Sequence, residues 1–188
     1  KKLLISPFST RRTFEHMIRN EMDLVRDGKV GKVTAKMNQL EDPDMVNLLY
    51  RASQAGVQIK LIVRGFSCLV PQLEGLSENI KMTSIVDTYL EHGRLYIFNN
   101  DGDPTMFMGS ADWMSRNLDR RIEVLAPIED SDVFQELNEI LAIQFKDNVK
   151  ARIHTPEEDN PFVEPENGAA KIRSQRAIYD YLKNKHAN

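Results

Sequence analysis

A histidine next to an arginine forms the most reactive pairing that the sequence offers. His92 stands two residues before Arg94, at the start of a strand expected over 94–98. Because side chains alternate along a strand, both should lie on one side and could converge on one anionic group. A histidine placed in this way can donate to a phosphoryl oxygen, protonate a leaving group or carry a covalent phosphate. A lone histidine is structural about as often, so the neighbouring residues must decide.

Two further motifs bring phosphate-binding groups toward this histidine. Arg64 follows an apolar strand at 57–63, and ligands collect beyond the carboxyl ends of strands in open α/β sheets. A guanidinium there can hold a phosphate by two hydrogen bonds, although a single arginine at a strand end is more often solvated. Ser110 lies in a run of small residues at 109–112 that follows the next strand. A hairpin would return this run toward His92, where it would leave room for a ligand.

Basic residues elsewhere could extend the site into a cationic funnel. The first 36 residues hold nine basic and four acidic side chains. Lys36 and Asn38 end an expected strand, at the same sheet edge as the guanidinium if the strands are parallel. Three arginines lie at 116–121, where Glu123 could neutralise Arg121. Beyond Arg64 and His92, the predicted phosphate contacts are Lys36, Asn38, Arg94, Ser110, Arg120 and Arg121, with Arg11 as a further candidate.

Hydrophobic periodicity predicts the elements that must position these residues. In the first half, strands are expected at 3–5, 31–38 and 57–63, separated by helices at 10–27 and 43–55. This β-α-β-α-β order favours parallel pairing, with helices on both faces of the sheet. The expected fold class is α/β, with a mixed, mainly parallel sheet.

The second half of the chain is expected to add antiparallel strands and two helices. Strands are predicted at 84–86, 94–98, 105–108 and 121–125, with a hairpin turn at 99–104. A strongly periodic helix is predicted at 130–146, an irregular acidic connection at 155–170 and a short helix at 174–184. We expect residues 1–150 to form a catalytic domain, and residues 151–188 to pack on the same domain.

Composition limits the class of protein. The chain has 188 residues, enough for one ordinary domain, and its net charge of −3 excludes the strongly basic profile of a general nucleic-acid binder. Cys68 is the single cysteine, which excludes an internal disulfide or a cysteine-ligated zinc site and suits the reducing cytoplasm. No window approaches the roughly 18 uninterrupted apolar residues of a membrane span. Because the first residue is Lys1 and not methionine, and residues 1–7 already have the pattern of a strand in progress, we expect a piece of a longer chain.

Several of these segments together resemble the C-terminal region of bacterial polyphosphate kinase. The resemblance runs over nearly the whole chain. Its residues are 6–12, 35–38, 48–57, Leu61-Ile62-Val63-Arg64-Gly65, Leu90-Glu91-His92-Gly93-Arg94, Gly109-Ser110-Ala111-Asp112-Trp113-Met114 and 117–121. By fold, that family belongs to the phospholipase D superfamily, whose signature is H-x-K followed by aspartate and later by Gly-Ser-x-Asn. Here the signature is His92-Gly93-Arg94, with Asn99 at the aspartate position and Asp112 closing the later element.

The resemblance implies reversible transfer of the ATP γ-phosphate to inorganic polyphosphate through a phosphohistidine upstream of this chain. By motif, His92 would be the second active-site histidine and Arg64 a nucleotide-phosphate contact. The Mg²⁺ ligands are expected upstream, with no metal site in these residues. The implied partners are ATP or ADP, polyphosphate, the remaining domains of the same chain and further copies of the full-length protein, without nucleic acid. By itself the chain should be inactive, and membrane-surface association stays open.

Two other functions are compatible with the same residues. In a phospholipase D-like phosphodiesterase, His92 would itself be the nucleophile, and two chains would complete the site. The replacement of the signature lysine by Arg94 and of the aspartate by Asn99 argues against this alternative. The basic N-terminal third would also suit a non-enzymatic module that binds polyanions or mediates assembly.

Overall fold

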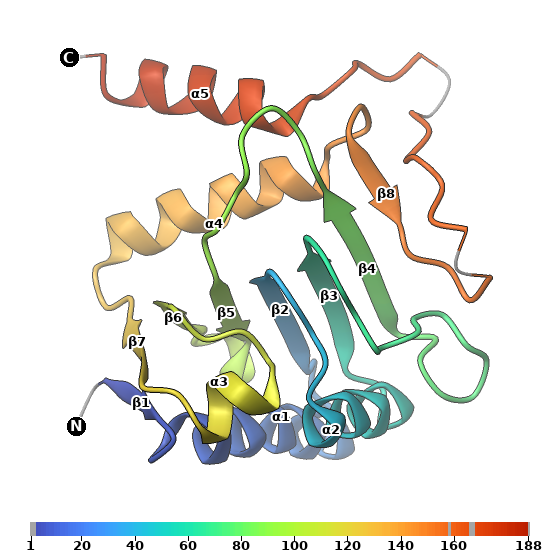
Figure 1. Ribbon diagram of the computed structural model, residues 1–188, viewed down its shortest axis with the longest axis vertical. Coiled ribbons are helices and arrows are strands. Elements are labelled where there is room, and N and C mark those ends of the chain that lie inside the picture. The colour runs from blue at the N-terminus through green and yellow to red at the C-terminus, as the bar shows by residue number, and fades with distance from the viewer. Residues whose placement is uncertain (1–2, 158, 166–167, 188) are drawn as a thin grey trace.

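The computed structural model describes residues 3–157, 159–165 and 168–187, and an eight-stranded sheet forms its centre (Figure 1). The strands are β1 (Leu4–Ser6), β2 (Lys32–Met37), β3 (Gln58–Val63), β4 (Ile80–Ile85), β5 (Leu95–Phe98), β6 (Thr105–Gly109), β7 (Glu123–Pro127) and β8 (Ala151–Ile153). The helices are α1 (Thr10–Arg26), α2 (Pro43–Gln54), α3 (Ser115–Asp119), α4 (Ser131–Phe145) and α5 (Ser174–Lys185), with a 3₁₀ turn η1 (Asn100–Gly102). The strand order is β1-β7-β6-β5-β2-β3-β4-β8.

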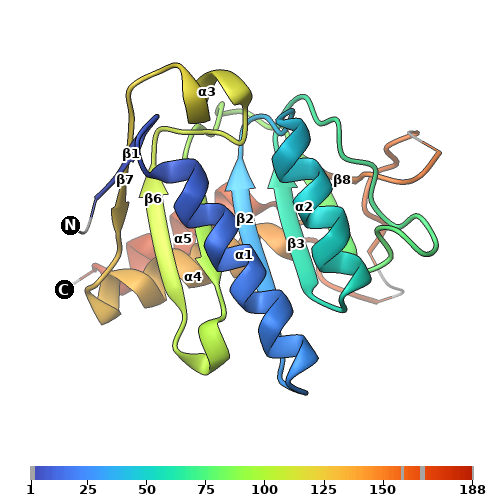
Figure 2. The ribbon, with the colours of Figure 1, turned by 90° about the horizontal axis from the view of Figure 1, so that it is seen from below.

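Helices cover both faces of the sheet, as the sequence predicts. Figure 2 shows α1 and α2 across one face and α4 and α5 behind the other. Helix α5 packs against α4, and β8 joins the sheet beside β4. The division of the chain at residue 150 stays a prediction.

The sheet is mixed, but the expectation that it is mainly parallel needs correction. In the described part of the chain, only β2–β3 and β3–β4 pair in parallel, and the other five pairs are antiparallel. Strand β1 pairs with β7 at the far edge instead of joining β2, and β5 takes the place beside β2. The parallel region of the sheet therefore consists of three strands, β2, β3 and β4.

The register of the central strands places several loops at one edge. Met37, at the end of β2, pairs with Val63, at the end of β3. Because β5 runs antiparallel to β2, its first residue Leu95 pairs with Lys36 at that same end. The hairpin then returns β6 so that Met108 pairs with Leu95. The loops after β2, β3 and β6 and the loop before β5 consequently meet at one edge of the sheet, the one formed by the carboxyl ends of β2 and β3.

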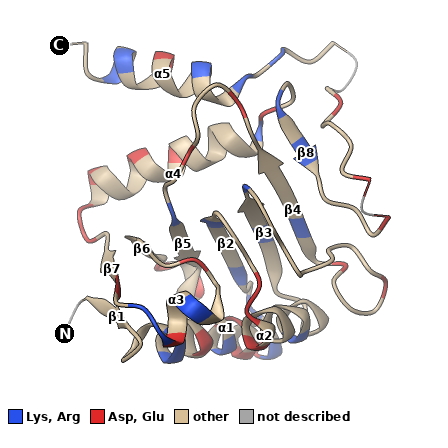
Figure 3. Ribbon diagram, in the orientation of Figure 1, with Lys and Arg blue, Asp and Glu red and all other residues tan. Residues whose placement is uncertain are grey.

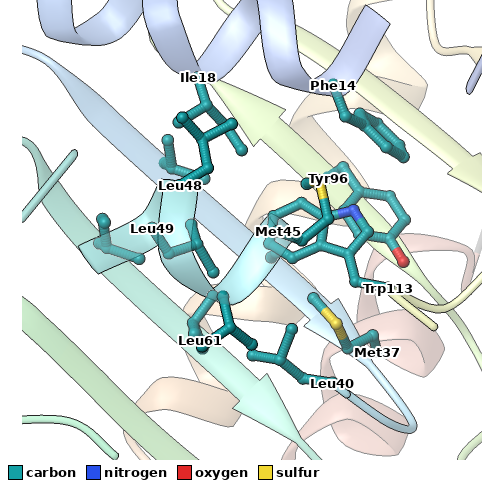
Figure 4. Close-up of a cluster of buried hydrophobic side chains, with 14 of the residues drawn as sticks. Phe14, Ile18, Met37, Leu40, Met45, Leu48, Leu49, Leu61, Tyr96 and Trp113 are labelled. Atoms are coloured by element: carbon teal, nitrogen blue, oxygen red, sulfur yellow. The ribbon is translucent and has the colours of Figure 1, made fainter. Parts of the chain in front are cut away.

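The hydrophobic core between the sheet and α1 supports this edge. Trp113, which follows β6, is fully buried and stacks on Tyr96 of β5, with 5.2 Å between ring centroids (Figure 4). Phe14 of α1 packs on both rings, at 4.7 Å from Tyr96 and 5.8 Å from Trp113. The carbonyl of Trp113 also accepts the backbone N–H groups of Glu41 and Asp42. Packing therefore fixes the loop after β6 to the loop after β2.

Local sequence signals explain the larger elements. Asp42 caps α2 by accepting the N–H of Met45 at 3.0 Å, and Pro43 occupies the first turn, where its missing N–H costs nothing. At Gly109 an added Cβ would lie 2.2 Å from the carbonyl oxygen of Val124, so only glycine allows β7 to approach so closely.

Some predicted boundaries differ from the structure. Strand β4 begins at residue 80, four residues earlier than expected, and β7 is shifted by two residues toward the C-terminus. The short elements α3 and β8 were not predicted. The acidic connection at 155–170 contains no helix where it is described, and its residues 158, 166 and 167, like residues 1 and 2 of the chain, lie outside the described ranges. Within those ranges, no helix combines the length and apolar character needed to cross a bilayer.

Candidate phosphate-binding site

A polar pocket of about 490 Å³ opens at the edge where these loops meet. Its walls come from the loops after β2, β3 and β6, from the loop before β5, and from the segment that includes α3 and the start of β7. The lining residues are Asn38, Gln39, Arg64, His92, Arg94, Ser110, Asp112, Met114, Arg116, Asn117, Arg121 and Glu123. The structure thus brings together six of the eight residues that the sequence analysis assigned to phosphate.

Arg64 and His92 are in direct contact. Nη1 of Arg64 lies 3.1 Å from Nδ1 of His92, and the same nitrogen donates to the carbonyl of Glu91. Because a guanidinium has donors only, Nδ1 must accept, which places the imidazole proton on Nε2. His92 is exposed, so Nε2–H can donate to a ligand in the pocket.

Arg94 is oriented by a buried carboxylate. Its Nε and Nη2 donate to Asp112 at 3.1 and 3.3 Å, and its Nη1 donates to the carbonyl of His92 at 3.0 Å. Asp112 is 4% exposed and also accepts the backbone N–H of Asn38 at 2.8 Å. Arg94 precedes β5, so strand alternation does not set its direction. It lines the pocket with two N–H groups left over from these three bonds.

Hydrogen bonds also tie the opposite wall together. The side-chain oxygen of Asn117 accepts the N–H of Asp112 at 3.0 Å, while its amide donates to Glu123 at 3.2 Å. Glu123 pairs with Arg121 at 3.3 Å, as the sequence predicts. Ser110 is bound to β7, because its Oγ accepts the N–H of Val124 at 3.2 Å.

The pocket carries an excess of positive charge. Four arginines line it against two carboxylates, which leaves two positive charges in excess among these side chains. Figure 3 shows part of this charge as the basic stretch between α3 and β7. Such a surplus in a polar hollow attracts anions such as phosphates, although the chain as a whole is acidic.

Two of the expected contacts lie outside the pocket. Lys36 is 9% exposed and forms an ion pair with Glu91, in a neighbouring cavity of about 330 Å³ on the α4 side of the sheet. Side-chain alternation explains this, because Ala35 and Met37 on either side of Lys36 face the core beneath α1. Arg120 ends α3 at the exposed surface and does not line the pocket.

Arg11 has a structural position. It forms ion pairs with Asp42 and Asp119, both at 2.6 Å, and joins α1 to the start of α2 and to α3. Hydrogen bonds to these carboxylates raise the pKa of its guanidinium. With its donors engaged in this way, Arg11 does not line the pocket.

Sequence reasoning did not anticipate Gln39, Met114 and Asn117 as parts of the site. Asn117 belongs to α3, a five-residue helix with no periodic signal of its own. Its role depends on the packing of α3 over the loop after β6, so no local pattern could have revealed it.

The pocket does not fit a divalent cation. Among the described residues, no group of three or more His, Cys, Asp or Glu side chains is arranged to hold a metal ion. The two pocket carboxylates, Asp112 and Glu123, are already paired with Arg94 and Arg121. Mg²⁺ would need free carboxylate oxygens as ligands, and these two paired groups do not offer them.

Comparisons with known proteins agree with the geometry. Residues 3–175 match the family model described as polyphosphate kinase C-terminal domain 2. The chain is 48% identical over 184 residues to a polyphosphate kinase of Vibrio vulnificus (strain YJ016), covering 98% of this chain and 26% of that protein. It is 46% identical over 181 residues to a polyphosphate kinase of Escherichia coli (strain K12), covering 96% of this chain and again 26% of that protein. The chain thus spans about a quarter of the length of these curated relatives.

Solved structures give the same result. The fold matches a crystal structure of polyphosphate kinase from Porphyromonas gingivalis with a TM-score of 0.95 and 42% identity, over 98% of this chain and 28% of that one. A phospholipase D family member, Nuc from Salmonella typhimurium, matches with a TM-score of 0.58 and 15% identity, over 81% of this chain and 96% of that one. This second likeness concerns the fold alone, and it supports the assignment of a phospholipase D-like fold. By its sequence and its structure, the chain belongs to the polyphosphate kinase C-terminal domain 2 family.

Proposed function

We propose that this chain supplies the half of a polyphosphate kinase active site that binds and neutralises the transferring phosphate. The reaction is the reversible transfer of the γ-phosphate of ATP to inorganic polyphosphate. The observation that carries the proposal is the contact of Arg64 with His92 at a pocket with a surplus of arginine.

The transfer has two steps. First, a histidine outside this chain attacks the γ-phosphorus, so that a P–N bond forms while the bond to the bridging oxygen breaks and ADP leaves with the electron pair. Next, a terminal oxygen of polyphosphate attacks the phosphorus, a P–O bond forms and the histidine is released. Both transition states concentrate negative charge on the phosphoryl oxygens, so positioning and electrostatic stabilisation provide most of the catalysis.

The two central residues have different tasks. Arg64 uses Nη1 for its contacts with His92 and Glu91, which leaves its Nε and Nη2 donors for phosphoryl oxygens. His92 presents Nε2–H, which can donate a hydrogen bond to a phosphoryl oxygen of the transferring group. Asn38, Arg94, Ser110 and Arg121 extend the anion-binding surface around them.

The rest of the proposed enzyme lies outside this chain. We place the phosphorylated histidine, the Mg²⁺ ligands and the base-binding part of the nucleotide site in the remaining domains of the full-length protein, which we expect to form a homo-oligomer. We place the protein in the reducing cytoplasm, which the single cysteine of this chain, Cys68, suits.

The test uses the full-length protein and measures polyphosphate synthesis from ATP. His92→Ala and Arg64→Ala should each lower kcat by roughly 10²- to 10³-fold, the usual cost of losing one well-placed electrostatic group. His16→Gln and Arg19→Ala change exposed residues of α1 and serve as matched controls that should keep parental activity. Parental rates in both pocket variants would refute the proposal.

Two further assays separate the competing functions. This chain alone, given ATP, Mg²⁺ and polyphosphate, should show no turnover, and robust turnover would show that the nucleophile lies within it. Hydrolysis of a chromogenic phosphodiester that depends on His92 would favour a phosphodiesterase. Polyphosphate binding that survives the double substitution of Arg64 and His92, together with parental synthesis, would favour a binding module.

A further inference from the structure

The loop that carries His92 has few packing contacts of its own. It connects β4 to β5, and Figure 1 shows it rising from the end of β4 toward α5 before it returns to the sheet. Its apolar side chains point to solvent, since Val86, Tyr89 and Leu90 are 62%, 74% and 71% exposed. No backbone ladder holds the segment 86–93, so polar contacts from other elements fix its conformation.

Gln175, the second residue of α5, holds the backbone of this loop directly. Its Nε2 donates to the carbonyl of Tyr89 at 2.7 Å, and its Oε1 accepts the N–H of Tyr89 at 3.0 Å. The amide therefore pairs with both polar groups of one residue, as a neighbouring strand would. The same Nε2 also donates to Oε1 of Glu91 at 3.2 Å.

Glu91 transmits this restraint to the site. Its other carboxylate oxygen binds Lys36 of β2 and Gln144 of α4, so its side chain links three elements. Its carbonyl accepts from Arg64, the residue that contacts His92. The conformation of Glu91 therefore sets the position of the next residue, His92, relative to the guanidinium.

A second contact from the start of α5 supports the same loop. Arg173, which precedes the helix, donates to both oxygens of Asp87 at 2.7 and 2.6 Å and to Oγ1 of Thr88 at 2.6 Å. The hydrogen bonds from Arg173 lower the pKa of the Asp87 carboxyl to about 2, so the pair stays ionised at neutral pH.

We propose that Gln175 is a positioning residue for His92, and that the start of α5 acts as a strap holding the histidine loop in its phosphate-binding conformation. The inference rests on the proposed function, because it assigns Gln175 a part in the same transfer. Gln175 does not line the phosphate pocket and acts through Tyr89 and Glu91. Loss of its contacts should leave His92 chemically intact but displaced from Arg64.

The test again uses the full-length protein, with variants of graded severity. Gln175→Glu keeps the size of the side chain but removes its donors and places a carboxylate against Glu91. Gln175→Ala removes the contacts without this repulsion. Arg176→Ala is the matched control, because Arg176 neighbours Gln175 on α5, is exposed, and directs its charge to Asp180 and to the ring of Tyr179 within the same helix.

We expect both Gln175 variants to lower kcat by roughly 10- to 100-fold, as displacement of a catalytic group by about an ångström does, while the KM for ATP changes little. Hydrogen exchange measured by mass spectrometry should accelerate in the peptide spanning 86–92, with the unfolding temperature unchanged. The Arg176→Ala variant should match the parent in all of these measurements. In a His92→Gln background, Gln175→Glu should add no further loss of rate, because a residue that acts through His92 has nothing left to position.

The outcomes separate this inference from the proposed function. If His92→Gln abolishes synthesis but both Gln175 variants keep the parental kcat, the positioning role is wrong and the proposed function stands. An additional loss from Gln175→Glu in the His92→Gln background, or a lower unfolding temperature with parental kcat, would equally refute positioning. If His92→Gln keeps the parental rate, the proposed function itself fails.

Discussion

Nη1 of Arg64 lies 3.1 Å from Nδ1 of His92, although 28 residues separate the two in the sequence. The contact arises because β3 ends, and β5 begins, beside the same end of β2. One guanidinium nitrogen thus fixes the tautomer of the imidazole, and the remaining donors of Arg64 stay directed to ligands. The two side chains form one unit, whose parts cannot be exchanged for residues of equal charge.

Arg64→Lys should therefore lose most of the activity although the charge is kept. A lysine ammonium is a compact point charge that cannot contact His92, the carbonyl of Glu91 and a phosphate in the fork geometry of arginine. We expect kcat of the full-length protein to fall by about 10²-fold in a polyphosphate synthesis assay. Arg19→Lys on the exposed surface of α1 is the control, and equal rates for both variants would show that charge alone suffices.

Asp112→Asn should destabilise the fold more than its small size suggests. The substitution keeps the shape but removes the charge that compensates Arg94, whose side chain is only 13% exposed. Breaking a buried pair on one side leaves an uncompensated charge, which costs about 3 kcal/mol. Urea unfolding measures the loss. Asp101→Asn, which breaks an exposed pair with Lys29, should lower the free energy of unfolding far less, and similar losses in the two variants would contradict this account.

Asp147→Asn should reduce stability at neutral pH and have little effect in acid. Asp147 is 1% exposed and accepts backbone N–H groups from Lys150 and Ser174, both at 2.7 Å, and from two further residues, Val149 and Ala151. Burial raises the pKa of this carboxyl, but the hydrogen bonds outweigh burial and the pKa is lowered from 3.8. We expect a loss of about 2 kcal/mol at pH 7, because bonds to a charged acceptor are stronger than neutral ones.

The pH dependence of this effect follows from the sign of the shift. Below pH 3.8 the unfolded state binds the proton more readily than the native state, so the stability contributed by Asp147 is lost as pH falls through the native pKa. Urea midpoints of the parent and the variant should converge there. A constant difference from pH 7 to acid would indicate that shape, and not charge, accounts for the effect.

His154 should make the fold less stable in mild acid. Burial lowers the pKa of its imidazole from 6.5, and its Nε2 is buried without a hydrogen-bond partner among the described residues. Below pH 6.5 the unfolded chain therefore takes up a proton that the native chain resists, and the unfolding free energy falls until the native pKa is reached. His154→Phe should reduce the slope of unfolding free energy against pH between 6.5 and 5.5. His16→Gln, at an exposed position, should leave it unchanged.

Helices whose apolar residues recur at a regular spacing could be predicted from the sequence, whereas very short elements could not. Helices α1, α2 and α4 carry apolar residues at helical spacing, and the structure confirms each within about one residue. The three residues of β8 form a strand because β4 offers them an edge, so no local signal could reveal them. The overestimate of parallel pairing has the same origin, since the partner of β1 lies more than 100 residues away in β7.

The sequence by itself determined which chemical groups are available and which loops carry them: the histidine, the arginines and the small residues after β6 follow strand ends that periodicity can locate. Tertiary structure decided how those groups are used. Lys36 pairs with Glu91 on the far side of β2, Arg94 with Asp112, and Gln175 reaches back to Tyr89. The physical reason is that hydrogen bonds and ion pairs depend on distances of a few ångströms between residues far apart in the chain. Periodicity constrains only neighbours within one element.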